Sequence, residues 1–336
     1  MAACARPVAT EHDFQAFGTT VRIEILHPDT EASKAAATAV EQLFRVAERD
    51  WYAFGTGELA RVNATLAQGH PAPVSAELAP LITQAIDLYS RSEGLFDPGV
   101  CALVRLWQFD SEDDLAAAAS PPPDAQIQSL RAHQGTLADL RFDGRTASSV
   151  RPLCIDLGGM AKGTALERAR AVLADRGIRS ALLDVGGSSL LAIGKKGTRP
   201  WVIGLRHPRE ARVFAQLALG PGEAVSTSGD YERGYEKDGR RYHHILDPAT
   251  GRPTTRSATV TVVADDAELA DAASTALMVA GPDRFRAIAA TLGIRTALLV
   301  TTRGELLTTP AMNVRLSRDN GGRLPAVDWP RSGPEL

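Results

Sequence analysis

The stretch CIDLGGMAKGTALERARAVLADRG, residues 154–177, joins an apolar run to a helix through two adjacent glycines. It predicts a strand, a turn at Gly158 and Gly159, and a helix that ends near Gly177. Glycines allow close backbone approach, and a helix N-terminus with Lys162 beside it suits an anion such as phosphate. A plain strand-to-helix turn with a surface lysine explains the pattern equally well, because the spacing is neither that of a P-loop nor GxGxxG.

The chain on either side of this stretch mixes strand and helix patterns. Before it, alternation predicts a strand over 19–26, helical spacing predicts helices over 29–51 and 76–94, and three consecutive prolines within 111–125 predict a loop. After it, strand patterns dominate. The expected elements there are strands over 181–194, 201–205, 212–219, 240–247 and 257–264, helices over 266–281 and 283–293, and hairpins over 226–253 and 296–309.

Length, charge and composition limit the possible folds and partners. A chain of 336 residues with 44% hydrophobic residues predicts one large domain or two intimately joined ones. The order of elements predicts a mixed fold with much antiparallel pairing rather than a regular βαβ alternation. A net charge of -3, no basic run and only 5% aromatic residues exclude a typical nucleic-acid surface.

The N-terminal sequence bears on the compartment. No run of 18 apolar residues occurs, so no transmembrane segment is expected. The first twenty residues have no basic n-region and no apolar h-region, which predicts a cytoplasmic protein as encoded. The opening MAAC nevertheless resembles the end of a lipoprotein cleavage site. If the true start lies upstream, a periplasmic protein that is lipid-anchored through Cys4 is the alternative.

The three cysteines, Cys4, Cys101 and Cys154, are far apart and form no CxxC pair. We therefore expect neither a disulfide framework nor a thiolate zinc site. Cys154 lies in the apolar run PLCIDL and is expected to be a buried small hydrophobic residue.

Asp271 and Thr275 lie four residues apart on an expected helix and so share one face. A carboxylate with a hydroxyl suits a hard cation such as Mg²⁺ or Ca²⁺ better than zinc. Taken alone, the pattern favours the simpler interpretation, in which Thr275 bonds back to a helical carbonyl and Asp271 is solvated.

The stretch HHILDPATG, residues 243–251, offers two histidines before a turn. Strand alternation puts His243 and Asp247 on one face and His244 on the other, which disfavours a metal site that uses both histidines. One histidine could act as a base or hold phosphate oxygens while the other is structural. A structural role is the commoner one for a single histidine on a strand.

Taken together and in order, seven motifs closely resemble those of the ApbE family: AFGTT, FDPGV…LW, DLGGMAKG, DVGG, TSGDYE, YHHILDPATG and ELADAASTAL. The resemblance implies an α+β, ApbE-like fold related to the T-fold. In such a fold, mixed and largely antiparallel sheets pack with helices, and the active site lies in a cleft between two intimately joined subdomains. The expected domain is 13–316, with an N-terminal segment 1–12 and a mobile C-terminal tail 317–336.

The family resemblance also implies an activity, that of an FAD:protein FMN transferase. Mg²⁺ would bind across the pyrophosphate of FAD. A threonine or serine hydroxyl of a target flavoprotein, in a motif of the type Asp-x-x-Ser/Thr-Gly-Ala-Ser/Thr, would attack the FMN phosphorus, and AMP would leave. Two alternatives remain, an FAD pyrophosphatase that yields FMN and AMP and a non-catalytic FAD-binding protein.

Specific roles follow from the family resemblance alone. His244 would be the catalytic histidine, deprotonating the attacking hydroxyl or steadying the phosphoryl oxygens, and Asp247 would orient that strand end and assist. The carbonyl of Ala161 and the side chains of Asp271 and Thr275 would bind Mg²⁺. The residues expected to contact FAD are Phe17, where the family usually has methionine, Asp97, Lys162, Thr164 and Ile245.

Overall fold

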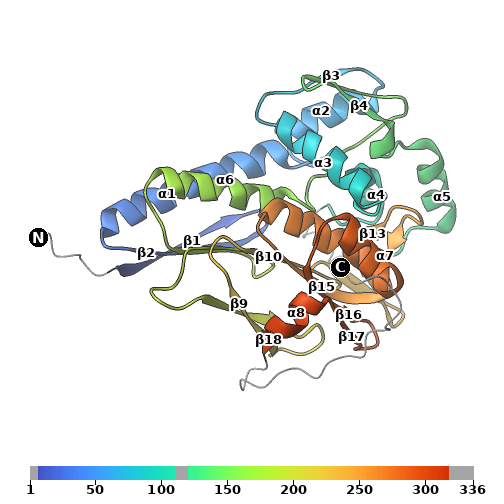
Figure 1. Cartoon of the computed structure of the whole chain (residues 1–336). Coiled ribbons are helices and arrows are strands. Elements are labelled where there is room, and N and C mark those ends of the chain that lie inside the picture. Colours follow the sequence, from blue (N-terminus) through green and yellow to red (C-terminus); the bar gives the residue numbers. More distant parts are fainter. Residues whose placement is uncertain (1–6, 111–119, 318–336) are drawn as a thin grey trace, which may run out of the picture.

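A large antiparallel sheet runs through the middle of the molecule (Figure 1), in a computed structural model that describes residues 7–110 and 120–317. Its eight strands follow the order β1-β2-β6-β7-β10-β15-β16-β17, and each neighbouring pair is antiparallel. The predicted α+β class with largely antiparallel pairing is confirmed. The strands are Val8–Ala16 (β1), Thr19–His27 (β2), Ala181–Val185 (β6), Ser189–Ile193 (β7), Ala224–Gly229 (β10), Ser257–Ala264 (β15), Thr296–Thr301 (β16) and Leu306–Thr308 (β17).

Three helices cover one face of this sheet (Figure 1): α1 (Thr30–Trp51), α6 (Ala161–Asp175) and α7 (Ala267–Thr291). Asp29 caps α1, since its side chain accepts hydrogen bonds from the backbone at the helix start. The two predicted C-terminal helices are the two halves of α7, which breaks at Gly281, where φ is 66°. Glycine tolerates this left-handed backbone, and the proline that follows it cannot continue the hydrogen-bond ladder.

A smaller sheet covers the opposite face of the large one. Strand alternation sends Val225 and Val263 to that side and Ala224 and Val262 to the helical side. The resulting second core also contains Trp201. The covering elements are β8 (Trp201–Arg206), β9 (Val213–Leu219), β18 (Leu316–Ser317) and helix α8 (Pro310–Arg315).

The remaining elements form a lobe beyond the end of α6 and α7 (Figure 1). Its own apolar cluster includes Leu103, Trp107 and Leu246, and the Trp107 ring stacks on Tyr242 at 5.7 Å. The helices are α2 (Glu58–Ala67), α3 (Ala79–Arg91), α4 (Cys101–Leu106), α5 (Asp124–His133) and the short 3-10 turns η1 (Pro98–Val100) and η3 (Leu137–Asp139). The strands are β3 (Ala72–Pro73), β4 (Leu140–Phe142), β5 (Thr146–Ser149), β11 (Gly234–Lys237), β12 (Arg240–His243), β13 (Leu246–Asp247) and β14 (Arg252–Pro253).

Two predicted strands are wrong. Residues 154–157 form an irregular loop, because the backbone of Ile155 pairs with the side chain of Asn63 instead of a strand. The strand predicted over 240–247 is divided at His244, because Arg240–His243 pairs with β11 whereas Leu246–Asp247 pairs with β14. A side chain thus replaces the strand partner in the first case, and a change of partner strand divides the run in the second.

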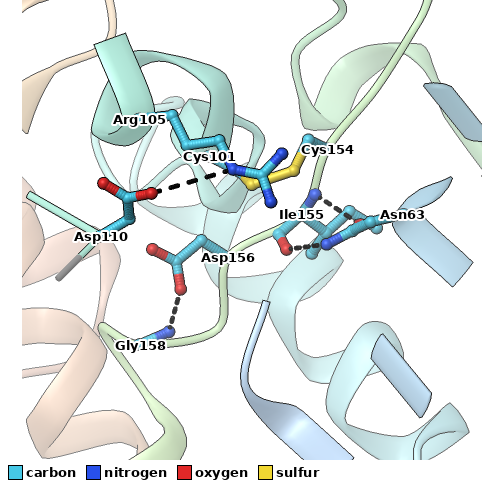
Figure 2. The surroundings of a disulfide bond; sticks show 8 residues. All are labelled: Asn63, Cys101, Arg105, Asp110, Cys154, Ile155, Asp156 and Gly158. Atoms are coloured by element: carbon cyan, nitrogen blue, oxygen red, sulfur yellow. Dashed lines mark hydrogen bonds and ion pairs between the residues drawn. A yellow bond between two sulfur atoms is a disulfide. The ribbon is translucent and has the colours of Figure 1, made fainter. Parts of the chain in front are cut away.

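The expectation about cysteines is also wrong. Cys101 and Cys154 form a disulfide (Figure 2), with their Cα atoms 5.3 Å apart. No local spacing signals this pair, because 53 residues separate the two cysteines. By the chain-entropy relation, closing such a loop contributes about 4 kcal/mol to stability. Cys4 lies outside the described residues.

The structure describes only part of the two expected end segments. Strand β1 begins at Val8, so part of the expected N-terminal segment belongs to the sheet. Ser317 closes β18, and the rest of the expected tail lies outside the described residues, as do residues 111–119 of the expected loop. Within 7–110 and 120–317, none of the helices combines the length and apolarity needed to cross a membrane.

Candidate active site

Asp271 on α7 is the most buried carboxylate of the candidate site, with 5% of its surface exposed. Its Oδ1 accepts hydrogen bonds from Ser226 Oγ at 2.8 Å and Ser189 Oγ at 3.2 Å, and its Oδ2 accepts one from Gly163 N at 3.0 Å. The alternative in which Asp271 is solvated is thereby excluded. Three of about four acceptor positions are used, so the carboxylate is held rigidly and retains room for one more ligand.

Thr275 lies one helical turn after Asp271, and its hydroxyl faces the turn that precedes α6. A Cβ built on Gly159 would lie 3.6 Å from Thr275 Oγ1, so the turn before α6 passes close to this hydroxyl. Thr275 Oγ1 also lies 3.3 Å from Ser228 Oγ on β10. The structure thus brings Asp271 and Thr275 together against the turn that leads into Ala161, the first residue of α6.

Lys162 and Thr164 in the first turn of α6 point to different partners. Lys162 Nζ donates to Ser188 Oγ at 2.8 Å, in the turn between β6 and β7. Thr164 is 4% exposed, and its hydroxyl contacts Met160 O at 3.1 Å and Glu268 Oε2 at 2.6 Å. Burial raises the pKa of Glu268 to about 7. A hydroxyl has one hydrogen, so both contacts form fully when Glu268 carries a proton and donates to Thr164.

Gly186 and Gly187 form the hairpin turn between β6 and β7, with φ values of 65° and 68°. It lies beside the β1–β2 turn, since a Cβ on Gly186 would meet Thr19 Oγ1 at 2.4 Å. Phe17 occupies that second turn with φ 54°, and its ring packs edge-on against Phe44 at 5.6 Å. Phe17 therefore lies at the same end of the large sheet as Ser188, the hydrogen-bond partner of Lys162.

The two histidines differ in their surroundings. His243 is 2% exposed, and its Nε2 lies 2.8 Å from the carbonyl of Thr254, which makes it structural. His244 is half-buried, and its Nδ1 lies 3.2 Å from the carbonyl of Arg233. We assign the hydrogen to Nδ1, because a carbonyl only accepts, and this leaves Nε2 with a free lone pair. Burial first, and the positive charge of Arg233 second, lower the pKa of His244 to about 3, so the ring is neutral.

Asp247 and Ile245 shape the chain next to His244. Asp247 Oδ1 accepts from Ala249 N at 2.9 Å and Oδ2 accepts from Thr250 Oγ1 at 3.1 Å, which closes the Pro-Ala-Thr-Gly turn. Ile245 is buried, and its carbonyl accepts from Thr254 N. In the structure, both residues order the strand end that carries His244.

Asp97 stands at the start of η1 in the FDPGV motif. Its Oδ1 accepts from Gly99 N at 2.7 Å and Leu137 N at 3.1 Å, and burial raises its pKa to about 6. Asp97 and Pro248 line the same pocket of about 100 Å³. The FDPGV and ILDP motifs therefore meet at this pocket, which has room for a part of a ligand but not for a dinucleotide.

Sequence reasoning missed three polar residues around these groups. Asp156 in the DLGG motif accepts from Gly158 N at 2.9 Å, and burial raises its pKa. Arg233 supplies the carbonyl that orients His244 and a charge that lowers its pKa. Glu268 reaches Thr164 from α7. Asp156 and Glu268 lie inside recognised motifs, and Arg233 lies opposite His244 in the register of the predicted hairpin, which pairs Gly234 with His243.

The comparisons with known proteins agree with this arrangement. The ApbE family model matches residues 17–299. The chain belongs to the ApbE family. An FAD:protein FMN transferase of Rhodobacter capsulatus is 41% identical over 323 residues, covering 95% of this chain and 61% of that protein. A Vibrio cholerae protein of the same name is 32% identical over 308 residues, covering 90% of this chain and 91% of its own length.

Solved ApbE structures share the fold. The ApbE protein of Thermotoga maritima superposes with a TM-score of 0.83 at 32% identity, over 92% of this chain and 99% of that one. The flavinyl transferase ApbE of Pseudomonas stutzeri gives a TM-score of 0.80 at 29% identity. This chain spans about three fifths of the Rhodobacter relative. The predicted family is confirmed, and the expected enzyme class, a transferase, agrees with these names.

The side chains around Asp271 fit a magnesium ion, which the family resemblance implies. Mg²⁺ prefers oxygen ligands and commonly binds one or two carboxylates together with substrate phosphates. Asp271, Thr275 and the nearby carbonyl of Ala161 offer that chemistry. In the described part of the chain, no group of three or more histidine, cysteine, aspartate or glutamate side chains is arranged to hold a metal. A site with one carboxylate is consistent with this, because substrate phosphate oxygens would supply further ligands.

Proposed function

We propose that this ApbE protein transfers FMN from FAD to a threonine or serine hydroxyl of a target flavoprotein, with Mg²⁺ and with release of AMP. The oxygen of the acceptor attacks the FMN phosphorus, and a new phosphoester bond forms. The bond from that phosphorus to the bridging oxygen breaks, and AMP leaves with that oxygen. The hydroxyl proton passes to His244 and then to solvent.

The orientation of His244 carries this proposal. Because Nδ1 is engaged with the Arg233 carbonyl, Nε2 is the atom available to accept a proton. This favours the role of base over that of a donor to phosphoryl oxygens, since a neutral ring with its hydrogen on Nδ1 has none to give at Nε2. A bound pyrophosphate would raise the pKa of His244 toward a useful range, because its negative charge stabilises the protonated ring.

The residues proposed to bind Mg²⁺ are Asp271, Thr275 and the carbonyl of Ala161. When bound, the ion would neutralise charge on the FAD phosphates and on the departing AMP. The serine hydroxyls of Ser189 and Ser226 hold the Asp271 carboxylate in one orientation. Lys162 adds a positive charge at the α6 N-terminus, which suits a phosphate.

The proposed FAD contacts are grouped around two places. Phe17 and Lys162 lie at the sheet end near the β6–β7 turn, and Asp97 lies at the pocket shared with Pro248. Ile245 and Thr164 are buried, so their proposed part is to support the backbone on which FAD rests. Asp247 is proposed to keep the strand end of His244 in position.

The test uses the whole chain with FAD, Mg²⁺ and a protein domain that carries the Asp-x-x-Ser/Thr-Gly-Ala-Ser/Thr motif. We expect AMP release and an FMN-sized mass gain on the acceptor, and neither with an acceptor in which both Ser/Thr residues of the motif are replaced by alanine. AMP and free FMN in equal amounts regardless of the acceptor would identify an FAD pyrophosphatase instead. Bound FAD without AMP release would identify a non-catalytic flavin-binding protein.

A further inference from the structure

The loop between β5 and α6 has no regular structure, yet it leads directly to the proposed metal and phosphate residues. It is held at three successive residues. Cys154 is bonded to Cys101, Ile155 exchanges two 2.8 Å hydrogen bonds with the Asn63 side chain, and Asp156 N donates to the Pro98 carbonyl at 2.7 Å. Figure 2 shows the disulfide and the Asn63 contacts beside Asp156.

The other half of the disulfide belongs to the FDPGV segment. Cys101 is fully buried and opens α4, directly after η1. Asp97 caps η1, and the pocket that it lines includes Val100 and Ala102 on either side of Cys101. The disulfide therefore joins two segments that are distant in sequence and that both carry residues proposed to bind FAD.

We propose that Cys101 and Cys154 are positioning residues whose disulfide fixes the FDPGV segment against the DLGGMAKG loop and so preorganises the FAD site. This inference rests on the proposed function. A loop without strand or helix hydrogen bonds has many conformations to lose on binding, and a covalent link next to the ligand lowers that cost. Neither cysteine touches FAD in this proposal, and neither takes part in the chemical step.

Formation of the bond has a defined chemistry. Two thiols lose two electrons and two protons to an oxidised dithiol catalyst, whose own disulfide becomes two thiols. Such bonds persist in oxidising compartments and are rare in the cytosol. The Cys101–Cys154 disulfide therefore favours the periplasm over the cytoplasm. FAD and the acceptor would then have to be supplied there as well.

The experiment compares the oxidised protein with the protein reduced by dithiothreitol and with the C101S/C154S variant. Alkylation followed by intact mass counts free thiols before and after reduction. FAD affinity is measured by flavin fluorescence with Mg²⁺ and without acceptor, at low temperature, where circular dichroism verifies the fold. Steady-state transfer then separates the KM for FAD from kcat.

We expect no free thiol at Cys101 and Cys154 in protein made under oxidising conditions. Reduction or C101S/C154S should weaken FAD binding and raise the KM by about fivefold or more, while kcat stays within about twofold. Leu217→Ala in the second core is the matched control, because it lowers stability away from the site and should leave FAD affinity unchanged.

Three results would overturn the proposal: two free thiols in oxidised, folded protein, an unchanged FAD affinity in folded C101S/C154S, or global unfolding on reduction at low temperature. Global unfolding on reduction would mean that the disulfide stabilises the whole fold rather than positioning the FAD site. A failure of the proposed function can be told apart from a failure of the disulfide proposal. In the former case, FAD binding would still depend on the redox state of the protein as expected, but no acceptor would be modified.

Discussion

The two sides of the candidate site are built differently. On the side proposed to bind Mg²⁺, called the magnesium side below, Asp271 and Thr275 project from one continuous helix segment, and hydroxyl groups of the large sheet hold the carboxylate. On the histidine side, His244 lies between two short strands, and a backbone carbonyl from Arg233 holds its ring. A regular element sets the first geometry, and long-range backbone contacts set the second.

The difference explains where a substitution should act. On the magnesium side, removing one hydroxyl leaves the helix and the sheet in place, so effects should be confined to metal binding. On the histidine side, the ring proposed as the base and its structural neighbour are adjacent in the chain, yet of these two rings only that of His244 keeps a nitrogen without a hydrogen-bond partner among the described residues. The following predictions test this contrast.

His244→Ala should have the largest effect. We expect turnover to fall by about 10²–10⁴-fold, the usual contribution of a general base, with FAD affinity changed by less than about threefold. The neighbouring His243→Ala is the control. It should keep most of kcat and lose about 1–3 kcal/mol of stability, because it leaves the buried carbonyl of Thr254 unpaired. Equal losses of turnover in the two variants would contradict the assigned roles.

Asp271→Asn should lower transfer by about 10²–10³-fold and abolish the thermal stabilisation given by Mg²⁺. Asparagine keeps the shape, and its Oδ1 can still accept from both serines, so only the Gly163 N–H loses its acceptor and the fold should remain. Asp271→Ala is the less informative change, because it would leave all three of these donors without an acceptor. Calorimetric titration with Mg²⁺ checks the result, and undiminished metal binding in Asp271→Asn would exclude Asp271 as a ligand.

Ser226→Ala should have a smaller effect of the same kind. It removes the 2.8 Å hydrogen bond to Asp271 Oδ1, which orients the carboxylate. We expect the Mg²⁺ concentration for half-maximal activity to rise about tenfold, with FAD affinity unchanged at saturating metal. Thr261→Ala is a suitable control, because its hydroxyl bonds to Thr227 in the same sheet but away from the carboxylate.

Glu268→Gln should have the smallest effect on transfer, and its main effect should be on stability. The pKa of Glu268 is raised from its ordinary value of 4.5 to about 7, so the stability linked to its protonated form is present below pH 4.5 and is lost as the pH rises through 7. The variant should therefore be more stable than the parent by about 3 kcal/mol at pH 8 and equal to it at pH 4. Denaturant unfolding at both pH values measures this, and an identical pH dependence in both proteins would contradict it.

Titration of His244 should change the stability of the protein with pH in the direction opposite to that of Glu268. Its pKa is lowered from 6.5 to about 3, so the stability linked to its neutral ring is present above pH 6.5 and lost as the pH falls. The two sides of the site thus respond to pH in opposite directions.

Helix and strand periodicity was enough to predict much of the magnesium side. The spacing of Asp271 and Thr275 placed them on one face, and the structure confirms this neighbourhood. The burial of Asp271 was not predicted, because its serine partners lie about 45 and 82 residues away in sequence. Periodicity carries no information about such contacts.

The histidine side and the DLGG loop were harder to predict. The strand expected across His244 is divided, because the residues before it pair with β11 and those after it pair with β14. A strand was also expected at Ile155, where Asn63 takes both backbone groups, and the Cys101–Cys154 bond was not foreseen at all. Partners distant in the sequence, or a change of partner strand, decide the structure in these cases, and family resemblance rather than local physics pointed to these segments.

The measurement that tests the central claim most directly is the intact mass of an acceptor domain after incubation with FAD, Mg²⁺ and either the parent protein or His244→Ala. With the parent, we predict one FMN-sized mass increase per acceptor and one AMP per FMN transferred, and with His244→Ala, bound FAD and an unmodified acceptor. An unmodified acceptor with the parent, or full modification with His244→Ala, would contradict the proposed transfer and its proposed base.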